Sequence, residues 1–463
     1  MSTGTEDQLA VREALLDLDR DLPGIGERLV GALREAIAQQ RIAPGTRLPS
    51  SRDLAADLGL SRGVVVAAYE QLTAEGRLVS RRGSGTTVAP APPPAPAVAG
   101  EPVAVPPGRV APLRPGVPDL GMFPRAAWRR AYERALATAA DADLDYTDPA
   151  GVPRLRSELA SYLGRVRAAR AGADGVVVTT GAAQALSLLG RVLAARGLTE
   201  VGVEDPGSAG IRGHLLAHGL SLRPVPVDGQ GAVVSALGDA RAVFVTPAHQ
   251  FPTGVVLAPG RRAELIDWAR RTGGLIIEDD YDAEFRYDRD PVGCLQGVAP
   301  DVVALVGSAS KALAPGLRRG WLVPPPGWLD AVRKAKSDAD MGGSALEQLA
   351  FAELLASGGY DRHLRRARRA QRARRDALVA ALRTHLPQAR ISGVAAGLHL
   401  VVELPSGTDD RTLAARARAA GLGPLALSEL RYGGDGPPGL VLGYAAQTPD
   451  ELTAAVVVLA SQL

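Results

Sequence analysis

Lysine and cysteine are the scarcest reactive residues of this 463-residue chain. Only three lysines occur, Lys311, Lys334 and Lys336, although lysine and arginine together number 53. The single cysteine, Cys294, excludes a disulfide framework and any zinc site built from several cysteines. The six histidines lack the spacing of a metal site, so we expect no bound metal.

Long apolar runs are also missing. No stretch reaches the roughly 20 apolar residues of a membrane span, and the acidic residues 1–21 lack the apolar segment of a secretion signal. We therefore expect a cytoplasmic protein with no membrane partner, in which the acidic residues 1–21 form a loose tail or a short helix. Hydrophobic residues reach 46%, which suffices for a large core, and the length predicts about three domains.

One of the few lysines follows a predicted strand. An apolar run over residues 302–306 leads through small residues to Lys311. Unlike arginine, a desolvated lysine can lose its proton, and its amine can then form a Schiff base with a carbonyl compound. Two plainer explanations compete with this one. Lys311 can be an ordinary lysine at the start of a helix, and scarce lysine can reflect the coding bias of a GC-rich genome.

Residues 22–88 have the pattern of a small DNA-binding domain. Apolar residues four apart predict a helix from Ile25, and serines at Ser50 or Ser51 and at Ser61 predict the starts of two more. A strand, an Arg-Gly-Ser-Gly turn and a second strand then predict a hairpin, so we expect a winged helix-turn-helix. Nine arginines against six acids favour double-stranded DNA as the partner. A winged helix that binds another protein is the alternative.

The remaining chain predicts a linker and an α/β domain. Residues 89–112 are rich in proline, which favours an extended linker. Residues 113–463 alternate apolar runs with helical patterns, which is typical of a mostly parallel sheet. Strands are expected at residues 175–179, 201–204, 242–246, 275–278, 302–306 and 320–323.

Polar groups follow several of these strands, where α/β proteins bind their ligands. Gly181 and its small neighbours start a helix and can offer N–H groups to a phosphate. The acids at 278–280 favour a cationic partner such as a protonated pyridine nitrogen. Ser308 and Arg318 can donate to a phosphate, and Lys311 offers an amine to an aldehyde. Phosphate, aldehyde and pyridinium occur together in pyridoxal 5'-phosphate.

Residues 48–86, LPSSRDLAADLGLSRGVVVAAYEQLTAEGRLVSRRGSGT, resemble the DNA-binding domain of GntR-family transcription regulators. Gly63 departs from this family, which usually has a polar residue there. The resemblance implies that six residues contact DNA: Arg52, Ser61, Arg62, Val64, Arg82 and Gly83.

Residues 113–463 resemble fold-type-I aminotransferases, with motifs such as VVVTTGAAQAL (176–186), IIEDDYDAEFRY (276–287) and GSASKALAPGLRRGW (307–321). The tandem of the two domains resembles the MocR/PdxR subfamily of bacterial regulators. The resemblance implies a homodimer in which Lys311 is the catalytic Schiff-base lysine and an acid, Asp279 or a neighbour, pairs with the pyridine nitrogen. It also implies cofactor contacts from Tyr281, His249, Gly181, Ala182, Ala183, Ser308, Arg318 and, across the dimer, Tyr146.

Two departures from the aminotransferase pattern bear on function. Ser208 replaces a tyrosine that stacks on the cofactor ring, and Val441 replaces an arginine that binds the substrate carboxylate. Because valine cannot bind a carboxylate, we expect weak or no transaminase turnover. We predict a transcription regulator that senses pyridoxal phosphate itself or an amine or amino-acid effector. An active aminotransferase with an accessory DNA-binding domain is the alternative.

Overall fold

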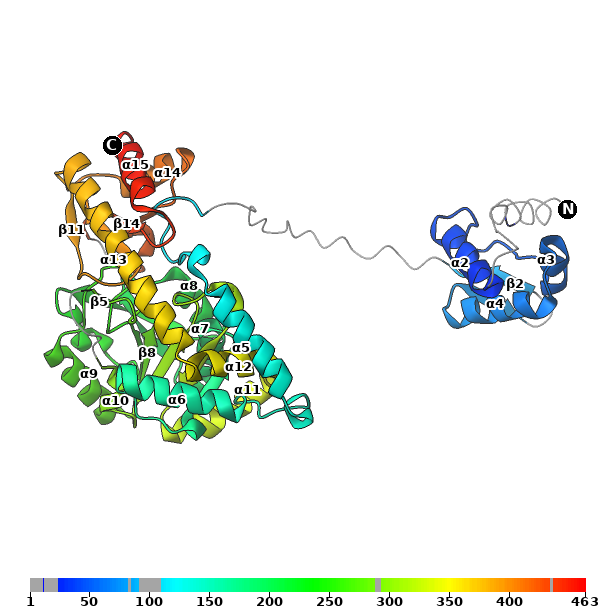
Figure 1. The fold of residues 1–463 in the computed structure, drawn as a ribbon, viewed down its shortest axis with the longest axis horizontal. Coiled ribbons are helices and arrows are strands. Elements are labelled where there is room, and N and C mark those ends of the chain that lie inside the picture. The colour runs from blue at the N-terminus through cyan, green and yellow to red at the C-terminus, as the bar shows by residue number, and fades with distance from the viewer. Residues whose placement is uncertain (1–10, 12–23, 82–84, 91–109, 288–292, 434–435) are drawn as a thin grey trace. The chain divides into compact units, whose positions relative to one another are not determined.

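The computed structural model describes residues 11, 24–81, 85–90, 110–287, 293–433 and 436–463. The chain divides into two compact units, residues 1–106 and 107–463 (Figure 1). Residues 1–21, expected as a tail, and the expected linker at 89–112 lie almost entirely outside the described residues. None of the described helices combines the length and apolarity that crossing a membrane requires.

Among the described residues of the first unit there are three helices and two paired strands, as the sequence predicts. Its second helix starts at the predicted serine, since the Ser50 hydroxyl accepts the N–H of Asp53. Gly59 ends this helix in the left-handed conformation, with φ 66°, which is an ordinary role for glycine. The elements are α2 (Ile25–Ala38), α3 (Ser51–Leu58), α4 (Arg62–Ala74), β1 (Leu78–Arg81) and β2 (Gly85–Val88).

An eight-stranded sheet forms the centre of the second unit. The strands are ordered β3-β10-β9-β8-β7-β4-β5-β6. The contacts from β9 through β8, β7 and β4 to β5 are parallel, whereas β10 and β6 run antiparallel to their neighbours. The mostly parallel sheet is therefore confirmed. The strands are β3 (Val177–Thr179), β4 (Glu200–Asp205), β5 (Ser221–Asp228), β6 (Gly231–Ala232), β7 (Ala242–Val245), β8 (Leu275–Asp280), β9 (Val303–Ser308) and β10 (Gly320–Val323).

Helices cover both faces of this sheet, and its strands are therefore apolar on both sides. Along β8, for example, Leu275 and Ile277 pack into the cluster that contains α7, and Ile276 packs into the cluster that contains α9. The helices of this part are α5 (Arg125–Thr138), α6 (Pro153–Arg167), α7 (Ala182–Ala195), α8 (Ala209–Leu216), α9 (Pro259–Thr272), α10 (Leu295–Val298), α11 (Leu329–Asp340) and α12 (Ala345–Ala356).

Strand β5 was not expected from the sequence, whereas all six predicted strands are present. The segment contains Pro224 and Pro226, and proline lacks the N–H that a central strand must donate. The structure accommodates them because β6 pairs only with Val227 and Asp228 of β5. The two prolines therefore lie where β5 forms the sheet edge.

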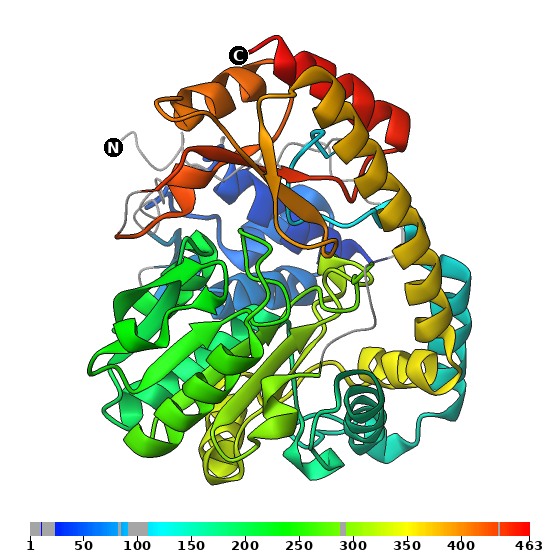
Figure 2. The same cartoon turned by 90° about the vertical axis from the view of Figure 1, so that its left-hand side faces the viewer.

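A smaller antiparallel sheet and three helices complete the second unit. The sheet order is β11-β12-β14-β13. The long α13 runs alongside both the large and the small sheet (Figure 2). The elements are α13 (Gly359–His385), β11 (Arg390–Ser392), β12 (His399–Glu403), α14 (Asp410–Ala419), β13 (Leu425–Ala426), β14 (Gly439–Gly443) and α15 (Pro449–Ala460).

Two arginine–aspartate pairs of the second unit have the same geometry but different burial. Arg167 binds both oxygens of Asp280 at 2.7 and 2.9 Å, and Arg270 binds both oxygens of Asp301 at 2.9 and 3.0 Å. The side chains of the first pair are 2% and 6% exposed, and those of the second are 49% and 53% exposed. Comparing the two pairs therefore measures how burial changes the contribution of an ion pair to stability.

Replacing Arg167 by methionine is expected to destabilise the second unit by about 3–5 kcal/mol, because the Asp280 charge stays buried without its guanidinium. The matched Arg270→Met change is expected to cost less than about 1 kcal/mol, since water replaces the lost partner. Urea unfolding of the full chain, monitored by tryptophan fluorescence, measures both. Equal losses for the two variants would contradict this assignment.

Candidate functional site

The carboxyl ends of the parallel strands meet at a cavity of about 350 Å³. Lys311 lies in the turn that follows β9, and β8 and β9 are paired so that Asp279 lies opposite Val306. Of the predicted site residues, seven line the cavity: Lys311, Asp279, Tyr281, Ala182, Ala183, Ser308 and Arg318.

Three of the predicted cofactor contacts do not line the cavity. Gly181 sits directly beside the cavity-lining Arg318, and a Cβ atom at Gly181 would lie 2.9 Å from the Arg318 Nη2. His249 is buried behind Tyr281, whose hydroxyl is 3.0 Å from the His249 Nδ1. Tyr146 is 83% exposed at another surface, beside Asp145 and Met341. Its predicted contact with a neighbouring subunit stays a prediction.

The three consecutive acids of β8 have three different environments. Glu278 accepts the main-chain N–H groups of Leu295 and Gln296, and burial raises its pKa to about 7. Asp280 forms the buried pair with Arg167. Asp279 points to the opposite face of the strand and into the cavity. Strand alternation therefore selects Asp279 as the acid available to a ligand.

Asp279 is a buried carboxylate with an unsatisfied oxygen. Its Oδ1 has no hydrogen-bond partner among the described residues. Burial, and then the charges of Asp280 and Asp282, raise its pKa from 3.8 to about 7, while the charge of Lys311 opposes the shift. A cationic or N–H-bearing group in the cavity would satisfy this oxygen.

The Lys311 amine is suited to react with a carbonyl group. Burial lowers its pKa, although the charges of Asp282 and Asp279 partly oppose this. The ammonium donates a hydrogen bond to the main-chain oxygen of Gly116. A lysine with a depressed pKa beside an acid is the arrangement expected for an amine that forms a Schiff base.

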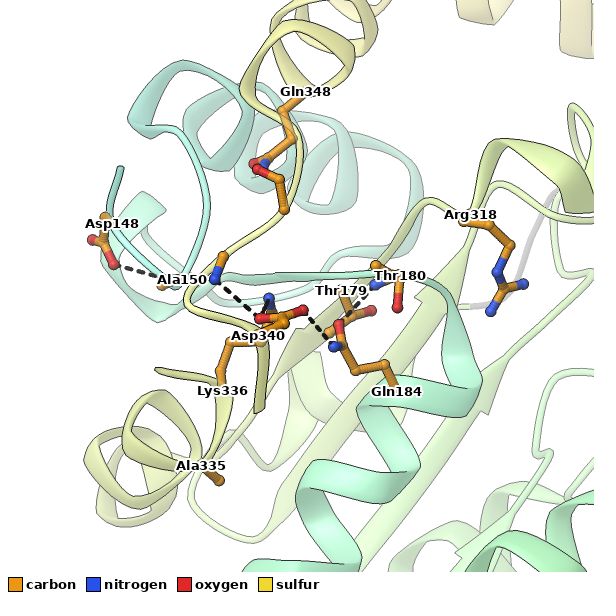
Figure 3. Close-up of polar contacts among 12 residues, drawn as sticks. Asp148, Ala150, Thr179, Thr180, Gln184, Arg318, Ala335, Lys336, Asp340 and Gln348 are labelled. Carbon is orange, nitrogen blue, oxygen red and sulfur yellow. Dashed lines mark hydrogen bonds and ion pairs between the residues drawn. The ribbon is translucent and has the colours of Figure 1, made fainter. Parts of the chain in front are cut away.

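The start of α7 forms a cradle for an anion. Gly181 precedes the helix with φ 100°, a conformation that favours glycine, and its close contact with Arg318 leaves no room for a side chain. The Gln184 side chain accepts the Thr180 N–H and donates to Asp340, which fixes this turn (Figure 3). Free N–H groups at a helix start, together with a guanidinium, suit a phosphate.

A buried polar group lies behind Tyr281. The His249 Nδ1 is 2.9 Å from the Asp282 Oδ2, and the ring of His249 lies 5.1 Å from that of His399. His399 lines the cavity, and burial lowers its pKa to about 4, so it is neutral at physiological pH. His399 was missed from the sequence because it lies on β12, far from the other residues along the chain.

Arg212 of α8 also lines the cavity. It is 8% exposed, and its Nη1 donates to the carbonyl oxygens of Gly207 and Leu430 at 2.9 and 3.0 Å. Val441, at the position where aminotransferases usually have their arginine, is fully buried in β14 and does not line the cavity. Ser208 lines it and caps α8.

The first unit exposes the start of α4. The side chains of Arg52, Ser61 and Arg62 are exposed, and the Ser61 hydroxyl does not cap the helix. Val64 is partly buried against the core of this unit, and its predicted contact with DNA stays a prediction. Arg82 and Gly83 lie outside the described residues. A Cβ atom at Gly63 would come no closer than 3.9 Å to Ser61, so a polar side chain would fit there.

The raised pKa of Asp279 predicts a pH dependence in the cofactor-free protein. Between pH 3.8 and about 7 the folded chain holds a proton that the unfolded chain releases, so stability falls as the pH rises through this window. Asp279→Asn removes the free-energy cost of ionising this buried carboxyl group. We expect the variant to melt above the wild type at about pH 8 and to keep a smaller advantage at about pH 5.

Differential scanning calorimetry at both pH values checks this. Asp301→Asn serves as the control, since Arg270 lowers the pKa of Asp301 and the replacement should bring no gain at the higher pH. A melting temperature of Asp279→Asn at or below that of the wild type at about pH 8 would refute the assignment.

Comparison with known proteins identifies both units. Residues 25–88 match the gntR family of bacterial regulatory proteins, and residues 115–419 match aminotransferase class I and II. The chain is 36% identical to the HTH-type pyridoxine biosynthesis transcriptional regulator PdxR of Corynebacterium glutamicum, over 92% of this chain and 93% of that protein. It is 34% identical to the probable rhizopine catabolism regulatory protein MocR of Rhizobium meliloti, over 94% and 92%.

Solved structures support the fold of the second unit. An archaeal alanine:glyoxylate aminotransferase is 26% identical and superposes with a TM-score of 0.70, over 76% of this chain and 90% of that one. The predicted fold, a winged helix-turn-helix followed by a fold-type-I aminotransferase domain, is thereby confirmed. The chain belongs to the MocR/PdxR subfamily of GntR-family transcription regulators.

Proposed function

We propose that this regulator binds operator DNA through residues 22–88 and binds pyridoxal 5'-phosphate at Lys311 in the domain of residues 113–463, with residues 89–112 as the linker. Occupancy of the cavity, by the cofactor alone or by an amine or amino-acid effector as well, controls binding to DNA. The observation that carries the proposal is the buried, unsatisfied Asp279 oxygen in the same cavity as the Lys311 amine.

The residues present fit pyridoxal phosphate. Asp279 supplies a carboxylate for a pyridinium nitrogen, and Lys311 supplies an amine for the aldehyde. Arg318, Ser308 and the start of α7 supply phosphate donors. When bound, the cofactor supplies an electrophilic aldehyde that reacts with amines. Tyr281, whose hydroxyl lies 3.0 Å from the His249 Nδ1, would donate to a polar atom of the ring.

The proposed DNA contacts come from the exposed start of α4. Arg62 and Ser61 begin the helix that would enter the major groove, and Arg52 flanks it. Arg82 and Gly83 would contact DNA from the hairpin turn. We place the protein in the bacterial cytoplasm, where its operator is accessible.

The exposure of Tyr146 supports the proposal of a homodimer with shared sites. The surface around this tyrosine exposes apolar side chains, since Leu144 is 62% and Met341 is 59% exposed. A second copy of the chain would cover them and would receive Tyr146 at its own phosphate site. Two DNA-binding domains per dimer then match an operator of two half-sites.

Transamination is the alternative function, and the similarity to an alanine:glyoxylate aminotransferase favours it. The absence of Val441 from the cavity lining argues against an ordinary substrate clamp at that position. Sensing needs reversible binding of an amine, and it needs no turnover.

Lys311→Ala is expected to abolish the visible absorbance of the purified holoprotein, because no other lysine lines the cavity. Lys334→Ala is the matched control, since Lys334 is exposed and pairs with Asp338. Absorbance spectra before and after dialysis measure the loss. A band that survives in Lys311→Ala would remove Lys311 from the site.

Arg62→Ala is expected to weaken binding to the DNA upstream of the protein's own gene and to reduce the salt slope of log K by about 1. Arg34→Ala is the control, because Arg34 pairs with Glu75 at the opposite end of α4. Fluorescence anisotropy at several salt concentrations measures both. An unchanged affinity in Arg62→Ala would show that another surface reads DNA.

Mixing the holoprotein with single amino acids separates sensing from transamination. We expect spectral changes that reverse on removal of the amino acid, with little oxo acid formed. Rapid, stoichiometric formation of oxo acid, measured by mass spectrometry, would favour the aminotransferase.

A further inference from the structure

Two arginine side chains line the cavity. Arg212 belongs to α8, and Arg318 belongs to the loop between β9 and β10. Arg318 lies against Gly181 at the start of α7, beside the proposed phosphate site. Arg212 projects from α8, which follows β4, and shares its part of the wall with Ser208 and Ile211. A single phosphate at Arg318 leaves Arg212 without an anion that it binds directly.

We propose that the effector bound in this cavity carries a carboxylate and that Arg212 binds it. This inference rests on the proposed function, since it names the chemistry of the ligand that the same cavity senses. Arg212 of α8 would then bind the carboxylate that Val441 of β14 cannot bind.

The hydrogen bonds of Arg212 leave it able to bind an anion. Its contacts with Gly207 and Leu430 both use Nη1 and both go to neutral carbonyl oxygens. Among the described residues, its Nε and Nη2 are not engaged, and these two atoms form an edge that matches a carboxylate. The ring of Tyr432 lies 5.4 Å from its guanidinium carbon.

The charge of Asp205 acts on Arg212, but both carboxylate oxygens of Asp205 accept hydrogen bonds from other groups. Its Oδ1 accepts the main-chain N–H of Tyr432, and its Oδ2 accepts that of Gly433, both at 2.9 Å. Burial lowers the pKa of Arg212 and so disfavours its charge. Within the described residues, the guanidinium of Arg212 donates only to neutral carbonyl oxygens. A ligand carboxylate would give it a negatively charged partner in direct contact.

Glu204, an acid that lines the cavity, does not compete for Arg212. Glu204 accepts hydrogen bonds from Thr246 and Gln250, and burial raises its pKa to about 7. Ser208, a small residue that caps α8, lines the cavity together with Arg212. Apolar side chains, Phe251 and Leu398 among them, line other parts of the wall and suit the hydrocarbon part of a small amino acid.

Arg212 also connects two parts of the fold. Gly207 belongs to the loop after β4 in the large sheet, and Leu430 precedes β14 of the small sheet. A carboxylate that attracts the guanidinium therefore acts on a contact between the large and small sheets. This gives the ligand a differential interaction with two arrangements of the domain, which regulation requires.

Paired probes test the carboxylate requirement in the holoprotein. L-alanine, β-alanine and γ-aminobutyrate are each compared with the amine in which a methyl group replaces the carboxylate: isopropylamine, propylamine and butylamine. Binding is followed by the change in visible absorbance. For the wild type we expect at least one amino acid to bind roughly tenfold or more tightly than its partner amine, as a charge-assisted contact predicts.

Arg212→Met should abolish this preference, and Arg212→Lys should retain part of it. Arg431→Met is the matched control, because Arg431 is a neighbouring arginine that donates to Pro437 outside the cavity. A preference that persists in Arg212→Met, or a wild type that binds no probe or prefers none of the three acids, would overturn the proposal.

The visible band and the melting temperature of each variant are measured first. They separate a failure of this inference from a failure of the proposed function. Variants with a normal band but no change in carboxylate preference refute only the role of Arg212, whereas a wild type without a band refutes the cofactor assignment.

Discussion

The buried carboxylate of Asp279 is the constraint around which the site is arranged. A charged group without partners is too costly to bury, and β8 places three acids in succession. The chain satisfies Glu278 with main-chain N–H groups and Asp280 with Arg167, and it leaves Asp279 to the cavity. The raised pKa of Asp279 and the lowered pKa of Lys311 are consequences of the same burial.

The cavity keeps groups that suit pyridoxal phosphate but lacks the arginine expected on β14. This combination favours sensing over transamination. The groups that suit a phosphate, an aldehyde and a pyridinium all line or adjoin one cavity. The arginine expected on β14 is replaced by the core residue Val441, whereas Arg212 reaches the cavity from α8. On this account the domain keeps the cofactor chemistry that recognises amines, and the wall contacts of the ligand serve regulation of the DNA-binding domain.

The sequence predicted the elements that follow simple periodicity and the residues at strand ends. Lys311, Asp279 and Ser308 follow or end apolar strands, so their convergence follows from a parallel sheet. His399 and the contact of Arg212 with Leu430 were not predictable, because they depend on how the small sheet packs against the large one. Strand β5 was missed because its prolines are tolerated only at a sheet edge.

In the proposed regulator, the state of the cavity controls DNA binding. Operator affinity measured with and without pyridoxal phosphate, in the wild type and in Lys311→Ala, tests it most directly. We expect the operator affinity to change roughly tenfold or more in the wild type and not at all in the variant, as differential binding to two states requires. Equal affinities in all four measurements would show that the cavity does not control DNA binding.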